Sequence, residues 1–197
     1  MPLRLGFVPQ DDRPVSWSQP AALLRLAGHD VVTPPRSILG NRDRPGDTEA
    51  IRRWLLRHAR DVDGWVLSLD MLAYGGLLAS RRPDAALDIC LKRLDHLASV
   101  QARAPQTPIL AFQAIRRLAI TIDSSVDIER WQATHRTAAP GRDRNHRVNF
   151  HAVELVRHGV INALTLLQED ARSKGPHIAE QARLAGWVAR HGLAERV

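Results

Sequence analysis

Short apolar runs alternate along the chain with segments in which apolar residues recur every three or four positions. The apolar runs have the length and composition of strands covered on both faces. They lie at 3–8, 30–33, 64–70, 109–112 and 162–167. The periodic segments have the spacing of amphipathic helices. They lie at 18–27, 47–58, 84–104, 144–158 and 176–191.

Five strand and helix pairs in alternation predict an α/β fold, in which a parallel sheet has right-handed crossovers. Five units suit either an open, doubly wound sheet or a partial (β/α) barrel, and the pattern does not separate these two. The chain shows no linker, repeat or low-complexity tract, so residues 1–197 are expected to form a single α/β domain. The stretch 122–144 has little periodicity and predicts no element of its own.

Carboxylates follow three of the predicted strands. Asp11 and Asp12 follow the first strand, Asp70 ends the third, and Glu169 and Asp170 follow the fifth. Because the carboxyl ends of parallel strands share one edge of the sheet, and ligands bind at that edge, these side chains are expected to form one site. The alternative for each is a solvated loop residue that caps the next helix. The repetition at several strand ends favours the site.

Clustered carboxyl groups shift one another's pKa values, so one can act as a general acid beside a base or nucleophile. Glycosidases use such a pair on either side of the bond that they cleave. The leading hypothesis is therefore a hydrolase that acts on a glycoside or another polyhydroxylated small molecule. Asp70 and Asp170 are the candidate acid and base, and Asp12 or Glu169 would hold substrate hydroxyls or a cation. A divalent cation, Mg²⁺ or Ca²⁺, is the cofactor that such oxygen ligands would suit.

Other polar residues near the predicted strand ends are expected to bind substrate. Arginines can clamp anionic oxygens, while amide, phenol and imidazole groups can hydrogen-bond to hydroxyls. The candidates are Asp11, Arg13, Tyr74, Arg116, Arg144, Asn145, Asn149, Gln168 and His177. The chain has no P-loop, no dinucleotide fingerprint and no His-Glu-x-x-His helix. A non-catalytic domain that binds a sugar or another small ligand remains the first alternative.

The formal net charge of +7 raises the question of nucleic-acid binding. Nearly all of the positive charge is arginine scattered along predicted helices, and no basic run is interleaved with aromatic residues, so we expect no nucleic-acid partner. The single cysteine, Cys90, excludes an internal disulfide, and no apolar run is long enough to span a bilayer. These features predict a cytoplasmic protein with a small-molecule ligand and no membrane partner. They leave homo-oligomerisation open.

Several blocks carry a resemblance to a known family. They are residues 9–15, 34–40, 44–48, 67–77, 144–149 and 168–177. In content and order these blocks resemble the signature blocks of a bacterial family catalogued as domain of unknown function 4127 (DUF4127). Members are longer than this chain, so the resemblance implies the N-terminal portion of a longer architecture. The segment 116–144 is compressed relative to the family, and Gln-Glu-Asp stands at 168–170 where Gln-Asp-Asp is expected. A truncated remnant without a complete site is therefore a second alternative.

Overall fold

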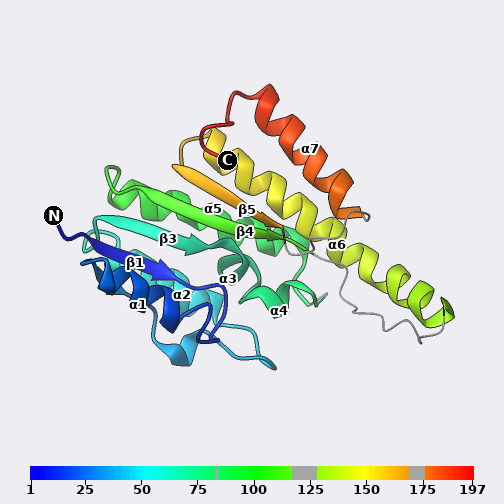
Figure 1. Ribbon diagram of the computed structural model, residues 1–197, viewed down its shortest axis with the longest axis horizontal. Helices are drawn as coiled ribbons and strands as arrows, with labels where there is room; N and C mark the ends of the chain where they lie inside the picture. The colour runs from blue at the N-terminus through cyan, green and yellow to red at the C-terminus, as the bar shows by residue number, and fades with distance from the viewer. Residues whose placement is uncertain (83, 117–127, 169–175) are drawn as a thin grey trace.

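The computed structural model contains one open sheet of five parallel strands in the order β2-β1-β3-β4-β5 (Figure 1). It describes residues 1–82, 84–116, 128–168 and 176–197. The strands are β1 (Arg4–Val8), β2 (Asp30–Val32), β3 (Gly64–Ser68), β4 (Ile109–Ile115) and β5 (Ala163–Gln168). The α/β prediction is confirmed, and of its two forms the structure has the doubly wound open sheet. This is the strand order of flavodoxin-like sheets.

The chain leaves the neighbouring strands β1 and β3 in opposite directions along the sheet. β1 and β3 are neighbours, with Phe7 opposite Val66 and Val8 opposite Leu67. From β1 the chain crosses to β2 on one side, whereas from β3 it crosses to β4 on the other. The loops that follow β1 and β3 therefore diverge at a topological switch point. Open α/β sheets bind their ligands in the crevice at such a point.

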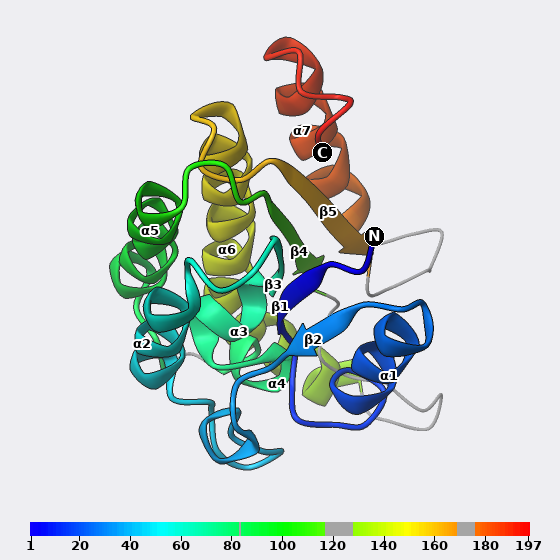
Figure 2. The same cartoon turned by 90° about the vertical axis from the view of Figure 1, so that its left-hand side faces the viewer.

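Helices lie on both faces of the sheet, as Figure 2 shows end on. The helices are α1 (Ser18–Leu26), α2 (Thr48–His58), α3 (Leu69–Tyr74), α4 (Leu77–Ser80), α5 (Leu87–Arg103), α6 (Ile128–Arg157) and α7 (Pro176–Arg190), with a short 3₁₀ turn η1 (Arg36–Ile38). α1 covers one face beside β2, and α2, α3, α5 and α6 cover the other (Figure 2). In the part of the chain that the structure describes, no helix is long and apolar enough to cross a membrane.

Two apolar clusters form because successive strand residues point to opposite faces. Val8, Trp65 and Leu67 join the larger cluster, under α2, α5 and α6. Trp54 of α2 packs edge-on against Trp65 at 5.7 Å between ring centroids, which confirms Trp54 as a core residue. Phe7 joins the smaller cluster, against α1. The carboxyl edge of the sheet is thus held by a rigid two-sided core.

The last helix packs against α6 beside β5. Trp187 of α7 meets the Phe150 ring edge-on at 5.8 Å and donates a hydrogen bond to Glu154. The segment after α7 then returns to the sheet, where the backbone N–H of Leu164 donates to the carbonyl of Arg196 at 2.7 Å. The outer edge of β5 is therefore partly paired within the chain.

The structure differs from the sequence prediction at three helix starts. α6 begins at Ile128 and takes in much of the stretch that lacked periodicity. That stretch contains Pro140 and Gly141, which are unfavourable inside a helix, and its buried positions Arg142 and Arg144 are polar, so no apolar period marks the helix there. α5 begins at Leu87 without a side-chain cap, so Asp84 does not cap it. The third strand ends at Ser68, whose hydroxyl accepts a hydrogen bond from the Met71 N–H, so Asp70 lies in the first turn of α3.

A glycine pair fixes the 40–46 loop against the exit of β3. The N–H of Gly46 donates to the carbonyl of Gly75 at 2.8 Å, and Gly75 has φ +83°. A Cβ at position 75 would lie 2.6 Å from the carbonyl oxygen of Gly46. Only glycine fits there, because a side chain would meet both an unfavourable backbone angle and a rigid neighbour.

We predict that Gly75→Ala lowers the free energy of unfolding by about 2–4 kcal/mol, since the left-handed angle and the backbone clash add. Gly28→Ala is the matched control: Gly28 has φ +89°, and a Cβ at this position would meet no other atom within 4 Å. It should cost only about 1 kcal/mol. Urea denaturation of both variants gives the comparison, and equal losses would contradict the close approach at Gly75.

Candidate functional site

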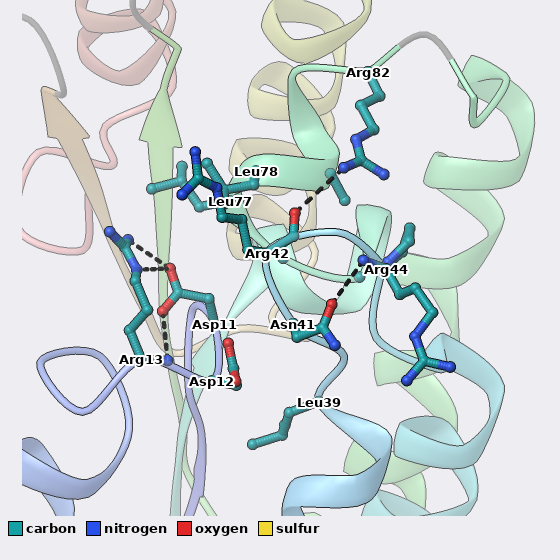
Figure 3. Close-up of a pocket in the computed structure, with 14 residues that line it drawn as sticks. Asp11, Asp12, Arg13, Leu39, Asn41, Arg42, Arg44, Leu77, Leu78 and Arg82 are labelled. Atoms are coloured by element: carbon teal, nitrogen blue, oxygen red, sulfur yellow. Dashed lines mark hydrogen bonds and ion pairs between the residues drawn. The ribbon is translucent and has the colours of Figure 1, made fainter.

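A cavity of about 310 Å³ lies at the switch point (Figure 3). Its walls are the β1 exit at 11–13, the segment 75–79 after α3, and the loop at 39–45, with Arg82 at the rim. Figure 3 shows Asp11 and Arg13 on one side, the loop residues Asn41 and Arg44 on the other, and Leu77 between them. The cavity is therefore polar on two walls and apolar on the third.

Asp11 is held by Arg13. Its Oδ2 accepts hydrogen bonds from Arg13 Nε at 3.0 Å and Nη2 at 2.6 Å, and its Oδ1 accepts one from the Arg13 backbone N–H at 3.1 Å. Burial by itself would raise the pKa of Asp11, but the bonds from Arg13 outweigh it and hold that pKa below its usual value. Asp11 is thus ionised at neutral pH. It can accept hydrogen bonds but does not suit the role of a general acid.

Asp12 has a looser environment on the same wall. Its Oδ2 pairs with Arg36 Nη2 at 3.4 Å, and the Arg36 side chain is 64% exposed. Asp12 also borders a second cavity of about 500 Å³, which shares Asn41 and Arg44 with the first. The Asp12 carboxylate therefore stands between two adjoining hollows, in reach of a ligand in either one.

The loop at 41–44 brings arginines that the sequence analysis did not select. Asn41 Oδ1 accepts from the N–H groups of Asp43 and Arg44, each at 2.9 Å, which shapes the turn. Arg82 donates to the carbonyls of Asp43 and Arg42 at 2.9 and 3.3 Å. Within the described residues, the exposed guanidinium groups of Arg42 and Arg44 have no hydrogen bond or ion pair. The one signal in the sequence was a polar turn between Gly40 and Gly46.

Asp70 is fully buried and joins three strand exits. Its Oδ2 accepts from Gln10 Nε2, after β1, at 3.1 Å and from the Ala114 N–H, in β4, at 3.0 Å. Two residues that line the cavity bond to this part of the chain: the Gly76 N–H donates to the Asp70 backbone carbonyl at 3.1 Å, and the Leu77 N–H donates to the Gln10 carbonyl at 3.2 Å. The first and third acidic strand ends therefore come together. Asp70 itself does not line the cavity.

A buried polar cluster surrounds Asp70 on the α6 side of the sheet. Asn145 donates to the Tyr74 hydroxyl at 3.5 Å and accepts from the Arg116 N–H at 3.1 Å. Burial and the nearby Asp70 carboxylate raise the pKa of Tyr74, so its phenol stays neutral. Gln113 and Asn149 are both 0% exposed. Neither of their amide groups forms a hydrogen bond within the described chain.

Two of the arginines predicted to bind substrate donate hydrogen bonds to backbone carbonyls. Arg144 donates to the carbonyls of Ala85, Ser80 and Arg82 at 2.6 to 2.7 Å and stacks over Tyr74 at 4.9 Å. Arg116 donates to the Arg81 carbonyl at 2.9 Å. These bonds hold the backbone at 80–82 and at Ala85, and Arg82 lies at the cavity rim.

The remaining candidates lie toward β5. Gln168 ends β5 opposite Ile115, and His177 is 2% exposed in the first turn of α7. Neither lines the switch-point cavity. Glu169 and Asp170 lie outside the described residues. Over the ranges that the structure covers, no three His, Cys, Asp or Glu side chains are placed to hold a metal ion.

The comparison with solved structures gives likenesses of low TM-score. A response regulator receiver domain protein from Clostridium thermocellum has 10% identity and a TM-score of 0.34, with 95% of this chain and 98% of that chain covered. A response regulator from Burkholderia pseudomallei has 12% identity and a TM-score of 0.38, with 98% and 75% covered. The siderophore hydrolase EstA from Aspergillus nidulans has 12% identity and a TM-score of 0.39, with 91% and 55% covered. Likenesses at this level say nothing about function.

No curated protein matches the chain. A family model does, over residues 5–139 and 139–197, and its description is "Protein of unknown function (DUF4127)". This match confirms the resemblance carried by the sequence blocks around the switch point. The chain belongs to the DUF4127 family.

Proposed function

We propose that this DUF4127 protein binds a small polyhydroxylated molecule with an anionic group in the switch-point cavity and hydrolyses it. The observation that carries the proposal is the cavity of about 310 Å³ between the β1 and β3 exits, where carboxylates face arginines. Ligands of open α/β sheets bind at this place, and pockets for small molecules begin at about this size.

The charged groups at the cavity suggest the ligand class. Arg42 and Arg44 offer exposed guanidinium groups, whose planar donors suit a carboxylate or a phosphate. Asp12 offers acceptor oxygens for hydroxyl groups. Leu77 and Leu78 give an apolar wall on which a sugar ring can lie. A sugar acid or a sugar phosphate combines these features.

Hydrolysis of such a molecule needs a proton donor for the leaving oxygen and a carboxylate that activates water or attacks carbon. In this proposal Asp12 contacts the substrate, because it is the carboxylate on the cavity wall with the looser partner. Asp70, Glu169 and Asp170 remain the candidates for the second carboxyl group. Asp11, which Arg13 keeps ionised, binds substrate hydroxyls as an acceptor.

A ligand-binding domain without catalysis is the second candidate. Two of the carboxylates already hold other parts of the fold by hydrogen bonds, which favours this candidate because such groups are less available for catalysis. Asp11 is bonded to Arg13, and Asp70 is bonded to Gln10 and Ala114. Turnover separates the two functions. A binder would keep its affinity for glycosides and leave them intact.

We predict that sugar acids or sugar phosphates raise the unfolding temperature of the wild type by about 5–10 °C at a hundredfold excess over Kd. Asp12→Asn and Arg42→Gln should weaken binding at least tenfold, because each removes a ligand contact in the cavity. Thermal shift and calorimetry with glucose, glucuronate and glucose 6-phosphate measure binding. Release of nitrophenol from the corresponding nitrophenyl glycosides measures hydrolysis.

Asp30→Asn is the control, since Asp30 is an exposed residue at the opposite, amino edge of the sheet. It should bind like the wild type. Equal weakening in Asp30→Asn and Asp12→Asn, or no response of the wild type to any compound, would overturn the proposal.

We predict that Asp11→Asn destabilises the protein by about 1–2 kcal/mol at pH 7, because it replaces charged hydrogen bonds with Arg13. The pKa of Asp11 is depressed in the folded state, so its contribution is present above the ordinary value of 3.8 and is lost as pH falls through the folded value. The difference between variant and wild type should therefore shrink as the pH is lowered from 7 to below 3.8. Urea unfolding at both ends of this pH range measures it, and a difference independent of pH would contradict the ion pair.

A further inference from the structure

The amides of Gln113 in β4 and Asn149 in α6 are buried without hydrogen-bond partners in the described chain. Both side chains are 0% exposed, and neither their oxygens nor their nitrogens form a hydrogen bond with a described residue. Folded proteins pair the large majority of their buried side-chain polar atoms, because an unpaired one destabilises the fold. Two complete amides in this condition point to a partner from outside the chain.

Both residues belong to the buried polar cluster around Asp70. Gln113 directly precedes Ala114, whose N–H donates to the Asp70 carboxylate at 3.0 Å. Asn149 lies one helical turn after Asn145, on the same face of α6, and Asn145 bonds to Tyr74 and to the Arg116 N–H. The two amides thus belong to the carboxyl edge of the sheet, where Asp70 meets the segment after β1.

This buried polar cluster is connected to the switch-point cavity by Gln10. Gln10 donates from its side chain to Asp70 at 3.1 Å, and its chain neighbour Asp11 lines the cavity. The Gln10 side chain is half-buried rather than enclosed. A ligand that contacts Asp11 in the cavity therefore lies one residue along the chain from Gln10, which bonds to the buried Asp70.

The hydrogen-bonding capacity of the two side-chain amides indicates which class of ligand group can pair with them. Each amide offers an acceptor oxygen and a donor nitrogen. A metal ion would use the oxygens and leave the nitrogens unpaired, and an apolar group would satisfy neither. A hydroxyl group both donates and accepts, so it can pair with either end of an amide.

We propose that Gln113 and Asn149 bind adjacent hydroxyl groups of the ligand, and so form the neutral, sugar-selective part of a site whose arginines hold the anionic part. This rests on the proposed function and extends it, because it assigns the hydroxyl end of the substrate to two residues that are enclosed in the ligand-free fold. Such residues lower the stability of the free protein and contribute to binding.

The test replaces each amide by an apolar side chain of similar volume, Gln113→Met and Asn149→Leu. Without ligand, both variants should unfold about 2–4 °C higher than the wild type, because an unpaired buried amide is removed. With glucose, glucuronate, glucose 6-phosphate or myo-inositol, each variant should bind at least tenfold more weakly than the wild type. Differential scanning fluorimetry gives the unfolding temperatures, and calorimetry gives the affinities.

Asn145→Leu is the matched control on the same face of α6. Its amide is bonded to Arg116 and Tyr74, so this variant should unfold at a lower temperature than the wild type. If Asn149→Leu and Gln113→Met also unfold lower, their amides belong to a structural network with water, and the proposal is overturned. It is overturned equally if both variants unfold higher and still bind the compounds as the wild type does.

The proposed function fails in a different way. In that case the wild type shows no shift with any compound, while the three variants keep the predicted order of unfolding temperatures without ligand. That outcome would remove the ligand class assigned to Gln113 and Asn149 together with the function.

Discussion

The carboxylate of Asp70 is the interaction on which the carboxyl edge of the sheet depends. It accepts hydrogen bonds from the Gln10 side chain and from the Ala114 backbone, so a single buried group ties together the segments after β1, after β3 and at the end of β4. A fully buried carboxylate is costly unless donors surround it. The positions of the two loops at the switch point are therefore coupled through one side chain.

The outer wall of the cavity depends on a second constraint, the contact between two glycines. Gly46 and Gly75 bring their backbones close enough to hydrogen-bond, which places the arginines of the 41–44 loop opposite the β1 exit. Arg144 completes the arrangement from α6, since its guanidinium group donates to the carbonyls of Ser80, Arg82 and Ala85 and so holds Arg82 in place. These backbone hydrogen bonds therefore determine which side chains from distant parts of the sequence line the cavity.

The sheet could be predicted from the sequence, whereas much of the site could not. The run at 64–67 is apolar throughout because helices and core cover both of its faces, and that pattern is local. The convergence of Asp11 and Asp70 followed from strand direction alone. Arg42 and Arg44 were missed because they reach the cavity through the Gly46–Gly75 contact, which no local pattern records. The start of α6 was missed because Pro140 and Gly141 interrupt the helical pattern and the buried residue that follows them, Arg142, is polar.

The chain segment that follows α7 has a consequence for self-association. The Arg196 carbonyl accepts a hydrogen bond from the Leu164 N–H, and the Arg196 guanidinium donates to the carbonyls of Asn162 and Ile161. Fewer backbone groups at the outer edge of β5 are therefore left without a partner. At the other border, β2 is only three residues long. Short or occupied border strands give an incoming strand little to pair with. Any assembly of this protein is therefore expected to use side-chain surfaces rather than a sheet continued from one molecule into the next.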